Sequence, residues 1–533
     1  MGGSLRRVLG SWLLYSSAHW MFMVAAGVAA FDQDGAGAVG IVAVARLLPA
    51  LAAAPVAGWL IDRLDRPRVV VVSCVLSALA LTAGSFVVAH HLALGWLVAA
   101  IVVESALGAP LRPALEALLP ALASEPADLV RATAGWSAVD SGGFLLGAGL
   151  GGVLLALTSP ATTVGLAAAL AALTAVLAAG LPRMVASEPV SDEESSGLLA
   201  GIRVVVSTPA LHAPFLLLAG LLVLEGATDV QLVALAIDRL DLGSGGPGLL
   251  YTVWGVGGVL GSVVLLRIVR RTGYGRALAV GAVLFGVLLA LAGVGTTLVA
   301  VALMLPVGLG FSLVEGAVMG VVPRLADDAV IGRVYGVSEL LYAGMAAIGA
   351  AMAPALIAWW GVGGSMATLG LVYACLALAT WRWCVRLDHG QQEATRVRDL
   401  LHDVPFLAPL PLPQLERLVR AAVPVQVTAG TDVVVQGETG DEFYLVGSGD
   451  LDVVEFGRTL GPGDGFGEIA LLRDVRRTAT IRSRTDATLW TFGRATFLAA
   501  LGATPEALTV ADGTVAEHLA RPPVDEDPAP SGA

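Results

Sequence analysis

The feature that most constrains the fold of this chain is a series of twelve long apolar segments between residues 8 and 386. Each segment is close to the length of about 20 residues that an α-helix needs to cross a bilayer. Backbone polar groups in lipid must be satisfied within the segment, so such segments form helices. We therefore predict an α-helical membrane protein with twelve transmembrane helices, near residues 9–31, 37–61, 69–89, 92–113, 131–157, 160–181, 210–237, 246–269, 277–295, 298–321, 334–359 and 364–385.

Composition supports the same class and excludes others. Charged residues make up 14% of the chain, against about 25% in soluble domains. The net charge of −12 is concentrated after residue 400, where the chain contains ten Arg and nineteen Asp plus Glu. That acidic balance disfavours nucleic acid as a partner. The three cysteines lack the spacing of metal ligands or disulfides, and no enzyme motif is present, so we expect neither a metal site nor an enzyme.

Arginine placement sets the expected orientation. Cytoplasmic loops of membrane proteins are enriched in Lys and Arg. With twelve spans and a cytoplasmic N-terminus, the Arg-rich loops all fall on the cytoplasmic side. We therefore expect a plasma-membrane protein with both termini in the cytoplasm, oriented by Arg63, Arg66, Arg68, Arg183, Arg203, Arg267, Arg270, Arg271 and Arg276.

The membrane part repeats itself. Gly58 corresponds to Gly261 and Pro120 to Pro323, and both pairs have the same spacing along the chain. A shared spacing indicates two six-helix repeats, residues 1–183 and 209–386, joined by a polar cytoplasmic linker at 184–208. Repeats of this kind pack around a cavity at the bilayer midplane and rock about it.

The loop between the second and third spans carries a specific resemblance. It has Gly58, an apolar run, then Asp62-Arg63 and the basic residue Arg66. This pattern resembles the signature loop of the major facilitator superfamily, which implies a transporter fold and a gating role for Gly58, Asp62, Arg63 and Arg66. Asp62 can face the positive end of a helix. The counterpart after Gly261 has lost the Asp-Arg pair.

Two further patterns narrow the resemblance. The glycine-rich stretch at 143–152 resembles the glycine motif of the family's antiporters, although Ala148 replaces its proline. The segment 108–113, the Leu-Pro-Ala-Leu loop and Arg131 resemble the drug and siderophore exporter branch. The alternative for the glycines is structural, because small residues four apart allow tight helix packing in lipid.

Charged residues inside the apolar spans are the candidate transport site. A charge at membrane depth is costly and marks a pathway, a relay or an ion pair. An apolar setting favours the protonated form of a carboxylate, which can then carry a proton. We expect at least one to couple protons. The alternative is that several form static ion pairs with Arg46 or Arg112, or lie at the membrane interface. The candidates are Arg46, Glu104, Arg112, Asp140, Glu225, Asp229, Glu315 and Glu339.

The C-terminal part has a different character. Short runs of β-formers separated by glycines between residues 433 and 457 predict a small antiparallel β-barrel or jelly roll. Helices are expected to flank it, at 413–422 and 494–501. We assign residues 387–403 to a connector, 404–520 to this domain and 521–533 to an acidic, proline-rich, disordered tail.

The same region resembles a cyclic-nucleotide-binding domain. The resemblance lies in the Gly437 to Tyr444 run, the Phe466-Gly467-Glu468 turn and the Arg477-Thr478-Ala479 segment. It implies that Gly467 and the following helix turn approach the cyclic phosphate, that Arg477 pairs with it, and that Glu468 accepts from the ribose hydroxyl. Thr478 favours cGMP only slightly over cAMP. The implied site comprises Phe466, Gly467, Glu468, Ile469, Ala470, Arg477, Thr478 and Ala479.

Together these patterns predict a secondary active transporter, a proton-coupled exporter of a small molecule, regulated by cytoplasmic cAMP or cGMP with no covalent cofactor. Its expected partners are the lipid bilayer, the cyclic nucleotide, the substrate and protons. Two alternatives stay open. The chain could be a membrane-anchored nucleotide receptor or scaffold without regulated flux, or it could export the cyclic nucleotide itself.

Overall fold

The computed structural model describes residues 3–122, 126–182, 197–325, 331–502 and 504–519. The chain divides into two compact units, Met1–Asp388 and His389–Ala533, which we call the helical unit and the sheet unit. Each unit has buried hydrophobic clusters of its own. The predicted tail at 521–533 and most of the predicted linker, up to residue 196, lie outside the described residues. The end of that linker belongs to a helix, α8 (Gly197–Ser207).

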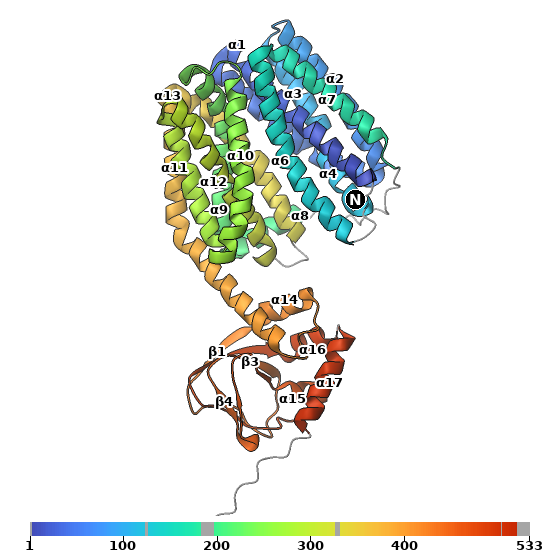
Figure 1. Ribbon diagram of the computed structural model, residues 1–533, viewed down its shortest axis with the longest axis vertical. Coiled ribbons are helices and arrows are strands. Elements are labelled where there is room, and N and C mark those ends of the chain that lie inside the picture. The colour runs from blue at the N-terminus through green and yellow to red at the C-terminus, as the bar shows by residue number, and fades with distance from the viewer. Residues whose placement is uncertain (1–2, 123–125, 183–196, 326–330, 503, 520–533) are drawn as a thin grey trace, which may run out of the picture. The chain divides into compact units, whose positions relative to one another are not determined.

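The helical unit is built from two groups of helices (Figure 1). The first group contains α1 (Gly3–Arg63), α2 (Arg66–Ala89), α3 (Leu94–Gly108), α4 (Leu111–Glu116), α5 (Leu118–Leu122), α6 (Pro126–Leu157) and α7 (Pro160–Ala179). The second contains α9 (Pro209–Ala234) with the π-helical turn η2 (Leu235–Arg239), α10 (Gly246–Thr272), α11 (Tyr274–Val294), α12 (Thr297–Leu325) and α13 (Ile331–Asp403). We call these two groups the first half and the second half of the helical unit.

The number of helices differs from the prediction. Ten helical stretches in the described residues are long and apolar enough to cross a membrane, where twelve separate helices were predicted. The difference arises because α1 and α13 each contain two of the predicted spans. Their backbones break from helical geometry at Asp34 and Gly35, and at Gly361, between the predicted segments. The fourth predicted span is also divided, with α3 and α4 separated near Pro110, which lacks a backbone N–H.

Small residues allow close contact of α6 with α1 in the same half and with α10 in the other half. A Cβ atom at Gly152 of α6 would lie 2.8 Å from the Cα of Gly248 in α10, and one at Gly147 would lie 2.5 Å from the backbone oxygen of Ser17. Such approaches are open only to glycine, as expected for helices that pack without a hydrophobic driving force in lipid. The glycine-rich stretch at 143–152 thus has a packing role against α1 and α10.

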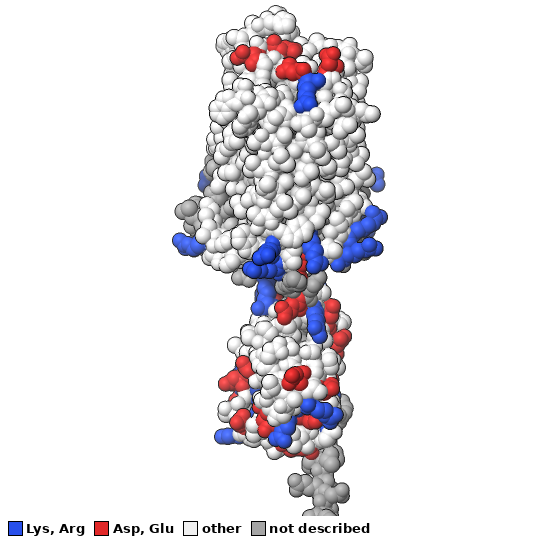
Figure 2. Space-filling view, turned by 90° about the vertical axis from the view of Figure 1, so that its left-hand side faces the viewer, with Lys and Arg blue, Asp and Glu red and all other residues white. Residues whose placement is uncertain are grey.

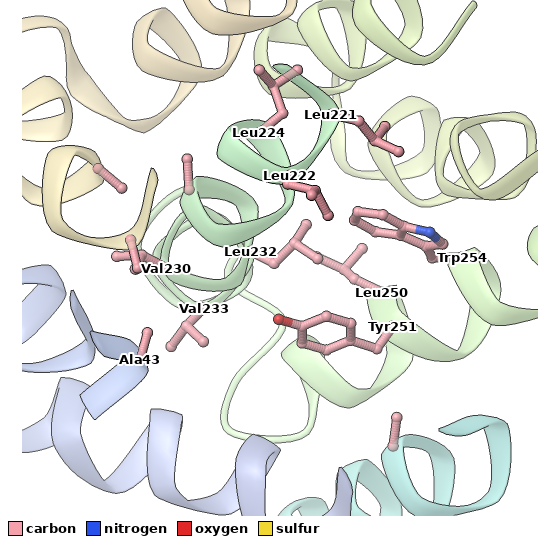
Figure 3. Packing of buried hydrophobic residues seen from close by; sticks show 14 of the residues in the cluster. Ala43, Leu221, Leu222, Leu224, Val230, Leu232, Val233, Leu250, Tyr251 and Trp254 are labelled. Atoms are coloured by element: carbon pink, nitrogen blue, oxygen red, sulfur yellow. The ribbon is translucent and has the colours of Figure 1, made fainter. Parts of the chain in front are cut away.

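The second half is held by large apolar side chains. Leu221, Leu222 and Leu232 of α9 pack beside Leu250 and Trp254 of α10 (Figure 3). All are buried. Charged residues on the face of the helical unit seen in Figure 2 gather at its two ends, with a broad uncharged band between them. That distribution is the one expected of a unit whose middle lies in hydrocarbon.

The sheet unit contains two four-stranded antiparallel sheets. One has the order β1 (Val423–Val427), β8 (Ala487–Gly493), β3 (Glu442–Ser448) and β6 (Gly465–Phe466). The other has the order β2 (Asp432–Val434), β7 (Ile481–Ser483), β4 (Leu451–Val453) and β5 (Arg458–Leu460), with the short 3-10 helix η3 (Val454–Phe456) after β4. Of the two predicted alternatives, a β-barrel or a jelly roll, the barrel is not formed. The two sheets stay open, because each ends in strands of two to five residues that pair on one side only.

Four helices belong to the sheet unit: α14 (Leu412–Ala421), α15 (Glu468–Arg473), α16 (Arg494–Gly502) and α17 (Pro505–Leu519). Helices α14 and α16 lie where flanking helices were predicted, α15 is the short helix expected after Gly467, and α17 was not predicted. Phe443 of β3 stacks on Phe497 of α16 with ring centres 4.5 Å apart, and the end of α13 adds Val397 and Leu401 to the same buried cluster. This core holds Phe443 and Leu445 of β3, next to Glu442 and the candidate site.

Candidate functional site

The predicted phosphate cradle is built from one turn and one loop. Strand β6 ends at Phe466, Gly467 takes a positive φ of 93°, and α15 begins at Glu468. An L-residue side chain is disfavoured at that φ, so glycine allows the abrupt change from strand to helix. Phe466, Glu468 and Ala470 are buried, while Ile469, Thr478 and Ala479 are partly buried. The structure therefore brings the predicted residues before and after α15 into one region of the sheet unit.

Arg477 occupies the centre of this region. Its side chain is only 6% exposed. The guanidinium donates to the carbonyl oxygens of Gly467 at 3.1 Å and Glu442 at 2.9 Å, and it interacts electrostatically with Glu468. Burial lowers the pKa of Arg477, but an arginine remains charged throughout the physiological range. The residue is thus a fixed cation held by backbone carbonyls.

The backbone of Arg477 is anchored as well. Its N–H donates to the carbonyl of Glu438 at 2.8 Å, and its own carbonyl accepts from Gly437 N–H at 2.9 Å. The neighbouring Arg476 points elsewhere, since it donates to the carbonyl of Gly437 at 2.8 Å and is exposed. The structure therefore supports the register in which Arg477, not Arg476, is the buried cation.

Aromatic residues form one side of the region. The rings of Tyr444 and Phe466 stack with centres 5.0 Å apart, and the guanidinium of Arg477 lies 5.7 Å from the Tyr444 ring. Tyr444 donates to Glu442 at 2.8 Å. Burial, together with this hydrogen bond, raises the pKa of Tyr444 to about 12. Tyr444 thus remains a neutral hydrogen-bond donor and packing surface.

Sequence reasoning missed Gly440 as part of the site. It is buried, and a Cβ atom there would overlap the guanidinium of Arg477. Glu442 was also missed, because it acts through its backbone carbonyl. The Gly437 to Tyr444 run was the available signal, but nothing in it distinguishes a glycine needed for space from one needed for a turn.

In the helical unit, the structure joins several predicted charges into pairs. Arg46 of α1 lies 2.8 Å from Asp229 of α9, which also accepts from Tyr251 of α10 at 2.8 Å. These residues line a small cavity of about 40 Å³ together with Trp20 and apolar side chains. The ion pair of Arg46 and Asp229 therefore links the first half of the helical unit to the second.

Glu225 lies one helical turn before Asp229. Its Oε1 accepts from Tyr342 of α13 at 3.3 Å, whereas its Oε2 is buried without a hydrogen-bond partner. It interacts electrostatically with Asp229, Arg46 and Glu315. The adjacent carboxylates are thus in different surroundings, one paired with an arginine and the other half-satisfied.

A second set of charges lies around Arg112. This residue contacts Glu116 at 3.1 Å and Asp140 at 4.0 Å, and Asp140 also accepts from Trp12 at 2.9 Å. Glu315 interacts electrostatically with Arg112, Asp140 and Glu339. Two predicted residues of the first half, Arg112 and Asp140, therefore interact with Glu315 of the second half, which in turn interacts with Glu339.

Glu104 forms a separate buried cluster within the first half. It is 1% exposed, accepts from Tyr15 at 3.1 Å and lies 3.8 Å from His19. The structure thus does not bring all eight predicted charges into one site. Among the described residues, no group of three or more His, Cys, Asp or Glu is arranged to hold a metal ion.

The described residues include part of the predicted gating loop. Arg63 lies over the ring of Trp59, with 5.2 Å from guanidinium carbon to ring centre, and Arg66 donates to the carbonyl of Ala117 at 3.4 Å. The backbones of Gly58 and Asp62 lie in α1, but the Asp62 side chain is outside the description. The predicted contact of Asp62 with a helix terminus stays a prediction.

The chain thus combines a helical membrane unit with a β-sheet domain that carries a candidate nucleotide site. Residues 8–350 match the Major Facilitator Superfamily, and residues 424–503 match the cyclic nucleotide-binding domain. The chain therefore belongs to the major facilitator superfamily and carries a C-terminal cyclic nucleotide-binding domain.

Comparison with solved structures concerns the helical unit. The nucleoside transporter NupG has a TM-score of 0.60 at 14% identity, covering 72% of this chain and 99% of that one. A POT family transporter in complex with 5-aminolevulinic acid also has a TM-score of 0.60 at 14% identity, covering 72% and 96%. At such identity the likeness shows the fold alone.

Curated relatives match the sheet unit. The cAMP-dependent protein kinase regulatory subunit of Yarrowia lipolytica is 37% identical over 123 residues, covering 22% of this chain and 33% of that protein. The cGMP-dependent protein kinase egl-4 of Caenorhabditis briggsae is 36% identical over 104 residues, covering 19% and 14%. The chain thus spans a third or less of the length of these relatives.

Proposed function

We propose that this protein is a secondary active transporter of a small molecule whose transport cycle is regulated by cAMP or cGMP bound to the sheet unit. The observation that carries the proposal is the buried Arg477, which lies beside Gly467 and the start of α15. A charged guanidinium is a strong partner for a phosphate. The names of the curated relatives, which include both cAMP- and cGMP-dependent proteins, support cyclic nucleotides as the ligand class.

Calorimetric titration of cAMP and cGMP into the purified full chain tests this proposal. We expect saturable binding that Arg477→Ala abolishes, because the variant removes the buried cation. Arg476→Ala is the matched control, since that exposed neighbour makes a backbone contact outside the cradle. Binding that survives Arg477→Ala would sink the assignment of the site. Binding without any effect on transport would favour the receptor or scaffold alternative.

We further propose twelve membrane crossings, with α1 and α13 each crossing twice. The breaks at Asp34–Gly35 and Gly361 support this count. Both termini and the sheet unit are then cytoplasmic in the plasma membrane, in agreement with the arginine distribution. Cysteine substitutions labelled from outside intact cells test it: Gly35→Cys and Gly361→Cys should react, whereas Arg271→Cys should not. If only Arg271→Cys reacted, the orientation in the membrane would be opposite to the one proposed.

The proposed mode of transport is proton-coupled export. It rests on the resemblance to the drug and siderophore exporter branch and to the antiporters of the superfamily. Glu225 is the preferred proton carrier, because one of its oxygens is buried without a partner while Asp229 is held by Arg46 and Tyr251. Infrared titration of the carboxyl groups should show a component that Glu225→Gln removes and Asp229→Asn retains. The reverse result would assign the proton to Asp229.

A further inference from the structure

An aspartate at the end of the helical unit is bonded to the start of a distant helix. Asp388 accepts from the backbone N–H groups of Gly275 at 2.6 Å and Arg276 at 2.8 Å. Its side chain is only 1% exposed. The contact joins α13 to the first turn of α11, far apart in sequence.

The contact follows from the chemistry of a helix N-terminus. The first N–H groups of a helix have no acceptor within it, and a carboxylate there also faces the positive end of the helix dipole. Asp388 therefore satisfies two donors of α11, a helix of 21 residues. Charge-assisted hydrogen bonds of this kind are stronger than neutral ones.

Two glycines make room for the aspartate. Gly273 has a positive φ of 96°, and a Cβ atom there would overlap the carboxyl group of Asp388. A Cβ at Gly275 would overlap the carbonyl oxygen of Cys384 and lie 3.0 Å from Asp388 Oδ1. The loop between α10 and α11 is thus shaped around this side chain.

The position of Asp388 in the chain gives the contact its significance. It is the last residue of the helical unit, and α13 continues beyond it to Asp403. The later part of that helix supplies Val397 and Leu401 to the core of the sheet unit. Along the chain, Asp388 is therefore the residue of the helical unit that is nearest to the sheet unit.

The second half has lost the Asp-Arg pair that the first half keeps at Asp62-Arg63. Asp388 supplies a carboxylate to the corresponding loop from another helix. We propose that Asp388 is the positioning residue through which nucleotide binding in the sheet unit alters the second half of the transporter. This inference rests on the proposed function, and it names the contact that transmits the regulation.

Hydrogen exchange of the full chain tests the inference without knowledge of the substrate. The amides of Gly275 and Arg276 have no acceptor within α11, so their protection reports the contact with Asp388. We expect saturating cAMP or cGMP to change their exchange rate in the wild type but not in Arg477→Ala. Asp388→Ala should raise their basal exchange by about tenfold or more, the loss expected for a charge-assisted hydrogen bond, and remove the nucleotide response.

Asp399→Asn is the matched control, since it alters an exposed aspartate further along the same helix and should keep both the protection and the response. Calorimetry on the same samples separates the outcomes. Nucleotide binding without a change at Gly275 and Arg276 would overturn the role of Asp388 and leave the sensor intact. Absence of nucleotide binding would overturn the proposed function and this inference with it. An unaltered response in Asp388→Ala would also refute it.

Discussion

At the residue scale, the decisive feature is how the buried Arg477 is held. Its guanidinium is bonded to two backbone carbonyls, so its position depends on the fold of β3 and the Gly467 turn. A buried charge needs such partners because burial without them is costly. The phosphate of a nucleotide would then meet a cation that is already positioned, which lowers the entropy cost of binding.

Gly440 gives this arrangement a sharp test. In Gly440→Ala the added methyl group would overlap the Arg477 guanidinium and displace it. Overpacking of this kind costs about 1–3 kcal/mol, so we expect nucleotide affinity to fall by about tenfold, measured by calorimetry. Gly493→Ala is the matched control, because a Cβ there meets nothing within 4 Å. Equal affinities for the two variants would contradict the role assigned to Gly440.

The site shows what sequence can and cannot reveal at this scale. Gly467, Glu468 and Arg477 were predicted because their spacing resembles a known cradle. Gly440 and the carbonyl of Glu442 were not, because their roles depend on contacts across the fold. Asp388 was missed for the same reason, since nothing near it in sequence indicates that α11 begins beside it.

At the element scale, the apolar segments predicted the membrane helices closely, but not the kinks through which α1 and α13 each join two predicted spans. Hydropathy indicates which segments lie in the membrane. The break at Gly361, in contrast, is set by the backbone conformation of one residue. In the sheet unit, the glycine spacing predicted short strands. It could not decide between a barrel and a jelly roll, because the pairing of strands depends on contacts that are distant in sequence.

Cross-strand ion pairs in the second sheet predict a pH dependence. Arg482 of β7 bonds to Asp432 of β2 at 2.6 Å, and this hydrogen bond lowers the pKa of Asp432. A carboxyl group with a lowered pKa in the folded state stabilises it above the unfolded pKa of about 3.9, and this stability is lost as the pH falls through the folded value. The effect is modest, because the pair is exposed.

Scanning calorimetry of the full chain between pH 3 and pH 7 measures this dependence. The transition of the sheet unit can be identified by its shift on addition of nucleotide. We expect Asp432→Asn to lower the melting temperature at pH 7 and to reduce its further fall below about pH 4. Parallel curves for the variant and the wild type would show that the ion pair does not contribute.

At the scale of the whole molecule, a superfamily transporter fold and a nucleotide-binding domain share one long helix. Regulation requires that the nucleotide bind one transport state more tightly than another, and the same coupling acts in both directions. The fold of each unit followed from sequence and resemblance. The coupling did not, because it resides in contacts such as that of Asp388 which neither unit's sequence pattern specifies.

The most direct test of regulated transport is a distance measurement between the two halves of the helical unit. Spin labels on Arg68→Cys of α2 and Arg271→Cys of α10, both exposed, report the opening of the arginine-rich end after Cys375→Ser removes the exposed native thiol. We expect cAMP or cGMP to shift the distance distribution in the full chain, and Arg477→Ala to abolish the shift. An identical distribution with and without bound nucleotide would show that the nucleotide does not regulate transport.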